Sequence, residues 1–256
     1  MMADVFVYVL CGITAGLIGG YLGLGGGIVM VPFLTVGTGM DIKAAVPVSV
    51  AAIVVNSVAS STEYLKKGMV DLELVVILAI FMAMGNITGS ILSDYIPSAV
   101  VRFLFTAVLV YTAFAFLKGK PPDERMVFSD NRRRYLPMCI LLVYVAGTLA
   151  ALIGIGGGVV IVPLLFLVIG LPLTTARGTS SFMIGFSATA ATAVYFFNGR
   201  LDLSVAPPVI VGIIIGGKIG GYLGTLAKPL VVKTLFFIVM LYLAFQLAYE
   251  PLVRLL

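Results

Sequence analysis

Two glycine-rich strings are the parts of this sequence best suited to binding chemistry. They occupy residues 23–32 and 154–163 and share the pattern Gly-x-Gly-Gly-Gly followed, after four further residues, by proline. A helix that restarts near Gly26 or Gly157 would direct unpaired N–H groups and the positive end of its dipole towards an anion. Close packing of helices through single glycines is the alternative. The repetition favours an anion site, whose candidate residues are Gly25, Gly26, Gly27, Gly156, Gly157 and Gly158.

Polar side chains in the apolar run after each string could complete this site. Hydroxyl and amide groups donate to oxyanion oxygens without the cost of burying several full charges. The candidates are Ser49, Asn56, Thr179, Ser180 and Ser181. Arg177 could supply a fixed counter-charge, and Val46 takes its place in the first copy, so we expect the second half to hold more polar contacts. Hydroxyls bonded to their own helix, and an Arg177 that reaches the membrane interface, are the alternatives.

Other kinds of chemistry find little support in the sequence. There is no histidine, and Cys11 and Cys139 lie in apolar runs without a CxxC motif. The glycine strings differ from a dinucleotide fingerprint because no acidic residue follows about 20 positions later, and no P-loop is present. We therefore expect no catalytic residue, no metal site, no cofactor and no ATP hydrolysis.

The composition is that of a membrane protein. Of 256 residues, 61% are hydrophobic and only 11% charged, against roughly 25% charged in a soluble domain. The basic residues concentrate in one connecting segment, at Lys118, Lys120, Arg125 and Arg132 to Arg134. The positive-inside rule places this segment in the cytoplasm, and its loop location argues against nucleic-acid binding.

The chain is an internal duplication. Displacing the sequence by 131 residues aligns the two glycine strings, then Tyr64 with Tyr195, and Asp71 with Asp202. The first transmembrane repeat is predicted at 1–117, a polar cytoplasmic linker at 118–135, and the second repeat at 136–256. Asp71 and Asp202 precede apolar runs, which predicts that they are helix N-caps.

The apolar runs predict an all-α polytopic fold with about four spans in each repeat. The first run of each repeat, 5–36 and 136–169, is too long for one straight span, so it must break, tilt or re-enter the membrane at its glycine triplet. We expect a break there. We favour eight main spans. A ten-element arrangement, in which both broken runs cross twice and the two repeats are inverted, is the alternative.

Duplicated membrane proteins with a site between their halves are characteristic of secondary transporters. We therefore expect alternating-access transport of a small anion bound near the midplane. A membrane enzyme and a non-transporting scaffold are the competing classes. The expected partners are the anionic substrate, the lipid bilayer and a coupling ion, either proton or sodium; a homodimer is left open.

The two glycine strings, together with Gly-Leu-Pro-Leu-Thr-Thr-Ala-Arg-Gly-Thr-Ser-Ser at 170–181, resemble the sulfite exporter TauE/SafE family, also called the toluenesulfonate uptake permease superfamily. The resemblance covers essentially the whole chain. It implies a multi-pass transporter of the cell inner membrane that moves sulfur-containing anions such as sulfite, organosulfonates or thiosulfate. Another small anion, such as a carboxylate, is the alternative substrate.

Overall fold

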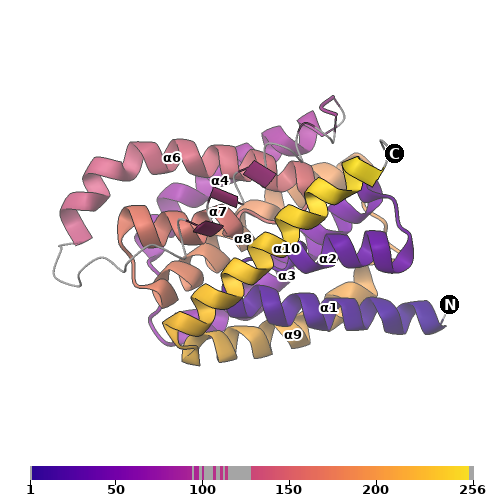
Figure 1. Ribbon diagram of the computed structural model, residues 1–256, viewed down its shortest axis with the longest axis horizontal. Coiled ribbons are helices and arrows are strands. Elements are labelled where there is room, and N and C mark those ends of the chain that lie inside the picture. Colours follow the sequence, from indigo (N-terminus) through magenta and orange to yellow (C-terminus); the bar gives the residue numbers. More distant parts are fainter. Residues whose placement is uncertain are drawn as a thin grey trace.

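The computed structural model describes residues 2–93, 95–97, 100, 106–107, 110–111, 113–114 and 128–253. This part of the chain is helical and contains no strand (Figure 1). The first repeat contains α1 (Met2–Leu22), α2 (Gly27–Pro32), the π-helix η1 (Phe33–Gly37), α3 (Ile42–Lys66) and α4 (Leu72–Leu92). The second contains α6 (Phe128–Ile153), α7 (Gly158–Pro163), the π-helix η2 (Leu164–Ile169), α8 (Leu173–Phe197), α9 (Ala206–Leu226) and α10 (Pro229–Val253).

Six helices in the described part of the chain are long and apolar enough to cross a membrane, which makes this a multi-pass membrane protein. They comprise Val5–Leu22, Ile42–Lys66, Leu72–Leu92, Tyr135–Ile153, Leu173–Phe197 and Ala206–Leu226. Two shorter apolar helices follow, at Gly158–Ile169 and Pro229–Tyr242. The apolar run 97–117, in which we expect the fourth span of the first repeat, lies mostly outside the described residues, as does segment 118–127 of the predicted linker. Helix α6 begins at Phe128, within that linker.

The predicted helix breaks are present in both repeats. The backbone at Gly23, Gly25 and Gly26 has φ values of 73°, 84° and 90°, in the left-handed region that residues with a side chain rarely adopt. Gly154 and Gly156 repeat this conformation, with φ values of 74° and 80°. Glycine is therefore required for the chain to leave α1 or α6 and start the short helix that follows.

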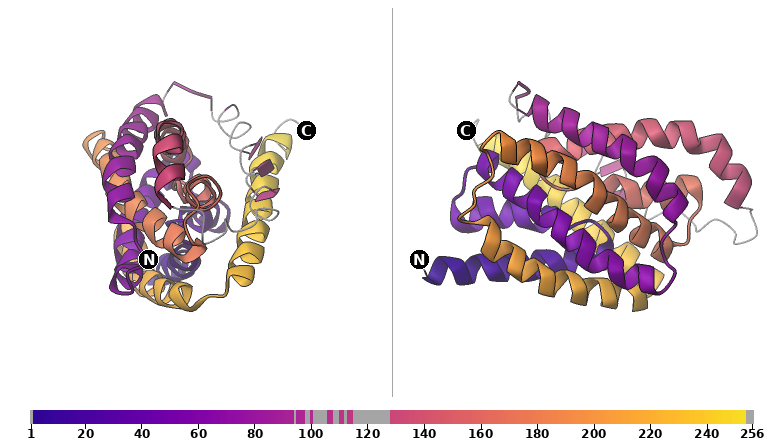
Figure 2. Two further views of the ribbon diagram at one scale, coloured as in Figure 1. Left: turned by 90° about the vertical axis from the view of Figure 1, so that its left-hand side faces the viewer. Right: turned by 180° about the vertical axis from the view of Figure 1, so that it is seen from behind.

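The two repeats exchange helices. The first helix of each repeat packs along the third long helix of the other, so α1 lies beside α9 and α4 beside α6 (Figures 1 and 2). Glycines bring these backbones into contact: Gly12 lies against Val209, and Gly20 against Gly221. Contacts that advance in the same direction along both helices mean that α1 and α9 run parallel. Small residues allow this close approach in membrane helix pairs.

The equivalent helices α3 and α8 pack against each other at the centre of the helix layer. Tyr64 lies against Gly178, Ser60 bonds to Ser181, and Ser57 lies against Gly185. Residue numbers rise along α3 while they fall along α8. These two equivalent helices are therefore antiparallel.

Asp71 and Asp202 lie in the turns before α4 and α9. Asp71 caps α4, because its carboxylate accepts a hydrogen bond from the Leu74 N–H at 3.0 Å, as predicted. Asp202 differs: α9 begins only at Ala206, and the Asp202 carboxylate accepts hydrogen bonds from the N–H and hydroxyl of Ser204. These hydrogen bonds lower the pKa of Asp202. The prediction that Asp202 is a helix N-cap is therefore wrong, and its carboxylate instead stabilises the turn before α9.

Candidate functional site

The two glycine strings meet each other in the interior of the protein. A side-chain carbon on Gly27 would collide with the carbonyl oxygen of Gly154, and one on Gly158 would lie 2.6 Å from the Cα of Leu24. All four residues are buried. Gly27 and Gly158, which are equivalent in the two repeats, therefore each pack against the glycine string of the other repeat. At Gly27 and Gly158, the packing role and the predicted site location coincide.

A pair of equivalent serines joins each helix to the glycine string of the other repeat. The Ser49 hydroxyl on α3 donates to the Gly154 carbonyl oxygen at 2.7 Å, and the Ser180 hydroxyl on α8 donates to the Gly23 carbonyl oxygen at 3.0 Å. Both serines are fully buried. These hydroxyls bond across the repeats rather than to their own helices, so they hold the strings in place. We call this pair the serine clamps.

The other predicted hydroxyls also bond between helices. Ser181 shares a hydrogen bond of 2.7 Å with Ser60, and Thr179 accepts one of 2.9 Å from the Asp71 N–H. The expectation that the second half holds more of the polar contacts to the anion stays a prediction. Both repeats contribute buried polar side chains. Those in the first half are Ser49, Asn56, Ser57, Ser60, Ser61, Asn86 and Ser90, and those in the second are Arg177, Thr179, Ser180, Ser181, Ser187 and Thr225.

Arg177 points into the protein and does not reach for the interface. Its side chain is only 1% exposed, and its Nη atoms donate to the carbonyl oxygens of Tyr21 at 2.8 Å and Gly224 at 2.9 Å. The guanidinium also lies 5.8 Å from the centre of the Tyr64 ring. Arg177 therefore links α8 to the ends of α1 and α9.

Asn56 is the candidate with unused hydrogen-bonding capacity. Its side chain is fully buried, and neither its amide nitrogen nor its carbonyl oxygen has a hydrogen-bond partner. It lies against Gly26 of the first string and against Gly19 and Gly217. A buried amide without partners is costly, which makes it a candidate ligand group.

One polar residue at the second string was missed by the sequence reasoning. Asn86 on α4 is 3% exposed and lines a small cavity of about 10 Å³ beside Gly156 and Gly157. By the 131-residue offset it is equivalent to Gly217, which lies against Asn56. Its position inside an apolar run was the available signal, because amides are costly in such runs.

Charged residues outside this centre have other roles. Glu63 pairs with Lys66 at 3.0 Å near the end of α3. Lys218 is exposed on the outer face of α9, and the Lys233 ammonium lies 5.0 Å from the centre of the Phe166 ring. Arg102 lies outside the described residues. Within the described ranges, no three His, Cys, Asp or Glu side chains come together as metal ligands.

Comparison with known proteins identifies relatives across the whole chain. A family model described as sulfite exporter TauE/SafE matches residues 8–247. A probable membrane transporter protein, YunE of Bacillus subtilis (strain 168), is 27% identical over 265 residues, which cover 95% of this chain and 97% of the relative. A probable membrane transporter protein of Xylella fastidiosa (strain Temecula1) is 30% identical over 219 residues, or 83% of each chain.

A plant relative matches a shorter stretch. The sulfite exporter TauE/SafE family protein 6 of Arabidopsis thaliana is 33% identical over 104 residues, which cover 38% of this chain and 24% of the relative. No solved structure matches the chain. Because the family model extends over nearly all of the sequence, the chain belongs to the sulfite exporter TauE/SafE family of membrane transporters.

Proposed function

We propose that this protein is a secondary transporter that moves a small sulfur-containing oxyanion, such as sulfite, an organosulfonate or thiosulfate, across the cell inner membrane. Family membership supports transport, and the family description supports the sulfur-containing substrate. The site lies where the two glycine strings meet, near the midplane. The basic linker lies on the cytoplasmic side, and a proton or sodium gradient drives the transport.

The mechanism is alternating access by two inverted repeats. The antiparallel packing of the equivalent helices α3 and α8 supports inversion, because a parallel duplication would give equivalent helices the same direction. The double-back of the chain at Gly26, which lies against Ala15 of α1, supports the ten-element version. In such repeats the substrate stays near the symmetry axis while the halves rock around it.

Asn56 is the observation that carries the location of the site. Its amide offers N–H donors to an oxyanion, and it lies beside Gly26, where backbone amides are not part of a regular helix. Nonhelical backbone at membrane depth is tolerated where it is buried in protein or lines a cavity. A bound oxyanion would satisfy the Asn56 donors that have no partner in this structure.

Flux into proteoliposomes tests the proposal. Purified protein is reconstituted, and uptake of ³⁵S-labelled thiosulfate and sulfite is compared with uptake of labelled sulfate and acetate under imposed proton or sodium gradients. We expect sulfur-anion uptake, and we expect Asn56→Ala to lower it at least tenfold. The control is Asn198→Ala, which removes an exposed amide from the end of α8.

Three results separate the alternatives. Uptake of acetate but not of sulfur anions would contradict the proposed substrate and support the transport function. If the Asn56→Ala variant took up sulfur anions at the wild-type rate, Asn56 would not be part of the site. No flux of any tested anion, under any gradient, would contradict the transport proposal.

A further inference from the structure

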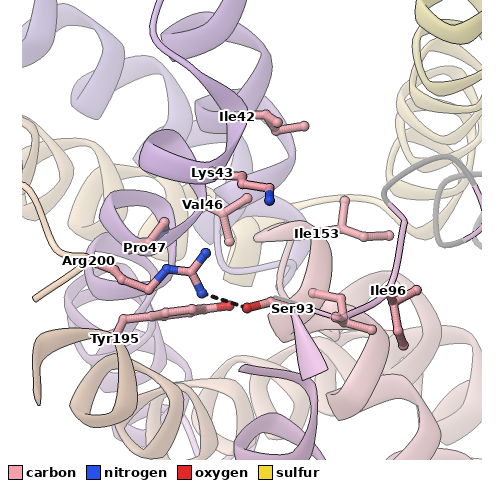
Figure 3. A pocket seen from close by; sticks show the side chains of 10 residues that line it. Ile42, Lys43, Val46, Pro47, Ser93, Ile96, Ile153, Tyr195 and Arg200 are labelled. Carbon is pink, nitrogen blue, oxygen red and sulfur yellow. Dashed lines mark hydrogen bonds between the residues drawn. The ribbon is translucent and has the colours of Figure 1, made fainter. Parts of the chain in front are cut away.

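Two arginines at opposite ends of α8 have matching surroundings. Arg200 follows the end of α8; its Nη1 donates to the Ser93 hydroxyl at 2.8 Å, and its guanidinium lies 5.7 Å from the centre of the Tyr195 ring (Figure 3). Arg177 makes the corresponding contacts with Gly224 and the Tyr64 ring. By the 131-residue offset, Ser93 is equivalent to Gly224 and Tyr195 to Tyr64. The two guanidinium groups therefore occupy equivalent places at the two ends of the repeat pair.

The arginines themselves are not equivalent in sequence. Val46 takes the position of Arg177 in the first repeat, and Met69 takes the position of Arg200. The Arg177 side chain enters from within α8, whereas the Arg200 side chain enters from the turn after that helix. Each end of the repeat pair therefore has a guanidinium group, and the two groups come from backbone positions that are not equivalent.

The two ends differ in whether space remains. Arg177 is 1% exposed and fills its place. At the other end the shorter Val46 leaves a cavity of about 60 Å³ at the ends of α3, α4 and α8. A cavity needs roughly 10–15 Å³ to hold one water molecule, so this one has room for several waters or one small oxyanion. Its lining includes Lys43, Val46, Ser93, Tyr195 and Arg200 (Figure 3).

The chemistry of this cavity suits an oxyanion. Two cationic side chains, Lys43 and Arg200, and the Ser93 hydroxyl converge on it from three segments of the chain. A guanidinium presents several N–H donors in a plane, and an ammonium adds a compact positive charge. Among the described residues that line the cavity, Lys43 and Arg200 carry a charge, and both are cationic, which favours anions there.

One wall of the cavity adjoins the second glycine string. Val46 at its inner side contacts Gly154 of the second glycine string, and Ser49, one turn further along α3, bonds to the same glycine. Ser49 lies six positions after Lys43, about 9 Å along the helix axis. An anion held at the cavity is therefore about two helical turns from the serine clamp.

We propose that this cavity is the access site through which the transported oxyanion reaches the centre. In the conformation described here, the protein is open at the cavity, and Arg177 closes the opposite end. The proposal rests on the proposed transport function. It assigns Lys43 and Arg200 to capture of the anion and Arg177 to closure of the opposite end.

Thiol labelling tests which end is open, without a flux measurement. The matched variants are Ile42→Cys, at the cavity, and Leu173→Cys, its equivalent at the Arg177 end, in a background with Cys11→Ala and Cys139→Ala. In detergent we expect an anionic methanethiosulfonate reagent to modify Ile42→Cys at least tenfold faster. Ethanesulfonate should slow that reaction more than gluconate does at equal ionic strength. Equal labelling of both variants, or equal protection by both anions, would overturn the proposal.

Transport kinetics test the two cations. In the thiosulfate uptake assay we expect Arg200→Gln and Lys43→Gln each to raise KM about tenfold, with the maximal rate within about twofold of wild type, because capture weakens while the central site is unchanged. Lys66→Gln removes an equal charge at the far end of α3 and serves as the control. KM values of both variants equal to that of the control would refute the access site.

The labelling result also separates this inference from the proposed function. If the wild-type protein moves no sulfur anion, the proposed function fails, while protection of Ile42→Cys by ethanesulfonate still supports an anion site. If transport occurs but the KM values do not change, the access site fails alone. Lys43 is exposed, so Lys43→Gln keeps the test valid should Arg200→Gln fold poorly.

Discussion

Loss of the serine clamps should destabilise the junction of the two repeats by a measurable and similar amount on each side. Ser49→Ala and Ser180→Ala each remove one hydroxyl donor from a carbonyl oxygen of a glycine string. Hydrogen bonds between membrane helices contribute about 0.6 kcal/mol on average and at most about 1.7 kcal/mol. A buried carbonyl that loses its donor adds a cost of about 1–3 kcal/mol.

The expected loss of unfolding free energy is therefore about 1–2 kcal/mol for each variant. Gly23 and Gly154 lie outside regular helices, at φ values of 73° and 74°. Their carbonyl oxygens are therefore less able to replace the lost serine donor with an N–H group of the same helix. Ser90→Ala is the matched control. Ser90 is equally buried, but its hydroxyl bonds at 2.9 Å to Ile87 within its own helix, where the carbonyl has a helical N–H partner available.

Equilibrium unfolding in mixed micelles, followed by circular dichroism, measures these differences. The double variant should lose the sum of the two single losses, because the clamps have separate partners. The clamp role would be refuted if the unfolding free energies of Ser49→Ala and Ser180→Ala were both within about 0.3 kcal/mol of that of Ser90→Ala. Such a difference is too small for the loss of a buried hydrogen bond.

Three further substitutions test the packing, a cap and the buried charge. Gly85→Ala places a carbon against the Tyr144 carbonyl oxygen and should cost about 1–3 kcal/mol in the same unfolding assay, whereas Gly37→Ala, which meets only the Phe33 ring, should be nearly neutral. Asp71→Ala removes the N-cap of α4 and should cost about 1 kcal/mol, seen as a lower Tm; an unchanged Tm would contradict the cap. Arg177→Lys cannot reproduce the planar fork that reaches both Tyr21 and Gly224, so it should lose about 1.5–3 kcal/mol, and wild-type stability would contradict this role.

Several features of this protein are determined by the sequence itself. Apolar composition requires a membrane protein, and the 131-residue repeat requires two equivalent halves. The glycine strings determine where the first helix of each half ends, because the backbone there adopts positive φ values that only glycine tolerates well. Local geometry depends on local residue type, so the predicted helix breaks at the two glycine strings were confirmed.

The tertiary structure alone decides how the halves combine. The clamp partners are 105 and 157 residues apart, and no local pattern links a serine to so distant a carbonyl. Helices that are apolar on all sides carry no clear stripe to indicate their inward face, so sequence could not show that Arg177 points inward or that Lys218 points outward. Nor could it show that Arg177 and Arg200 reach equivalent places, because that equivalence arises from the pairing of α3 with α8 and from side-chain length, and not from aligned positions.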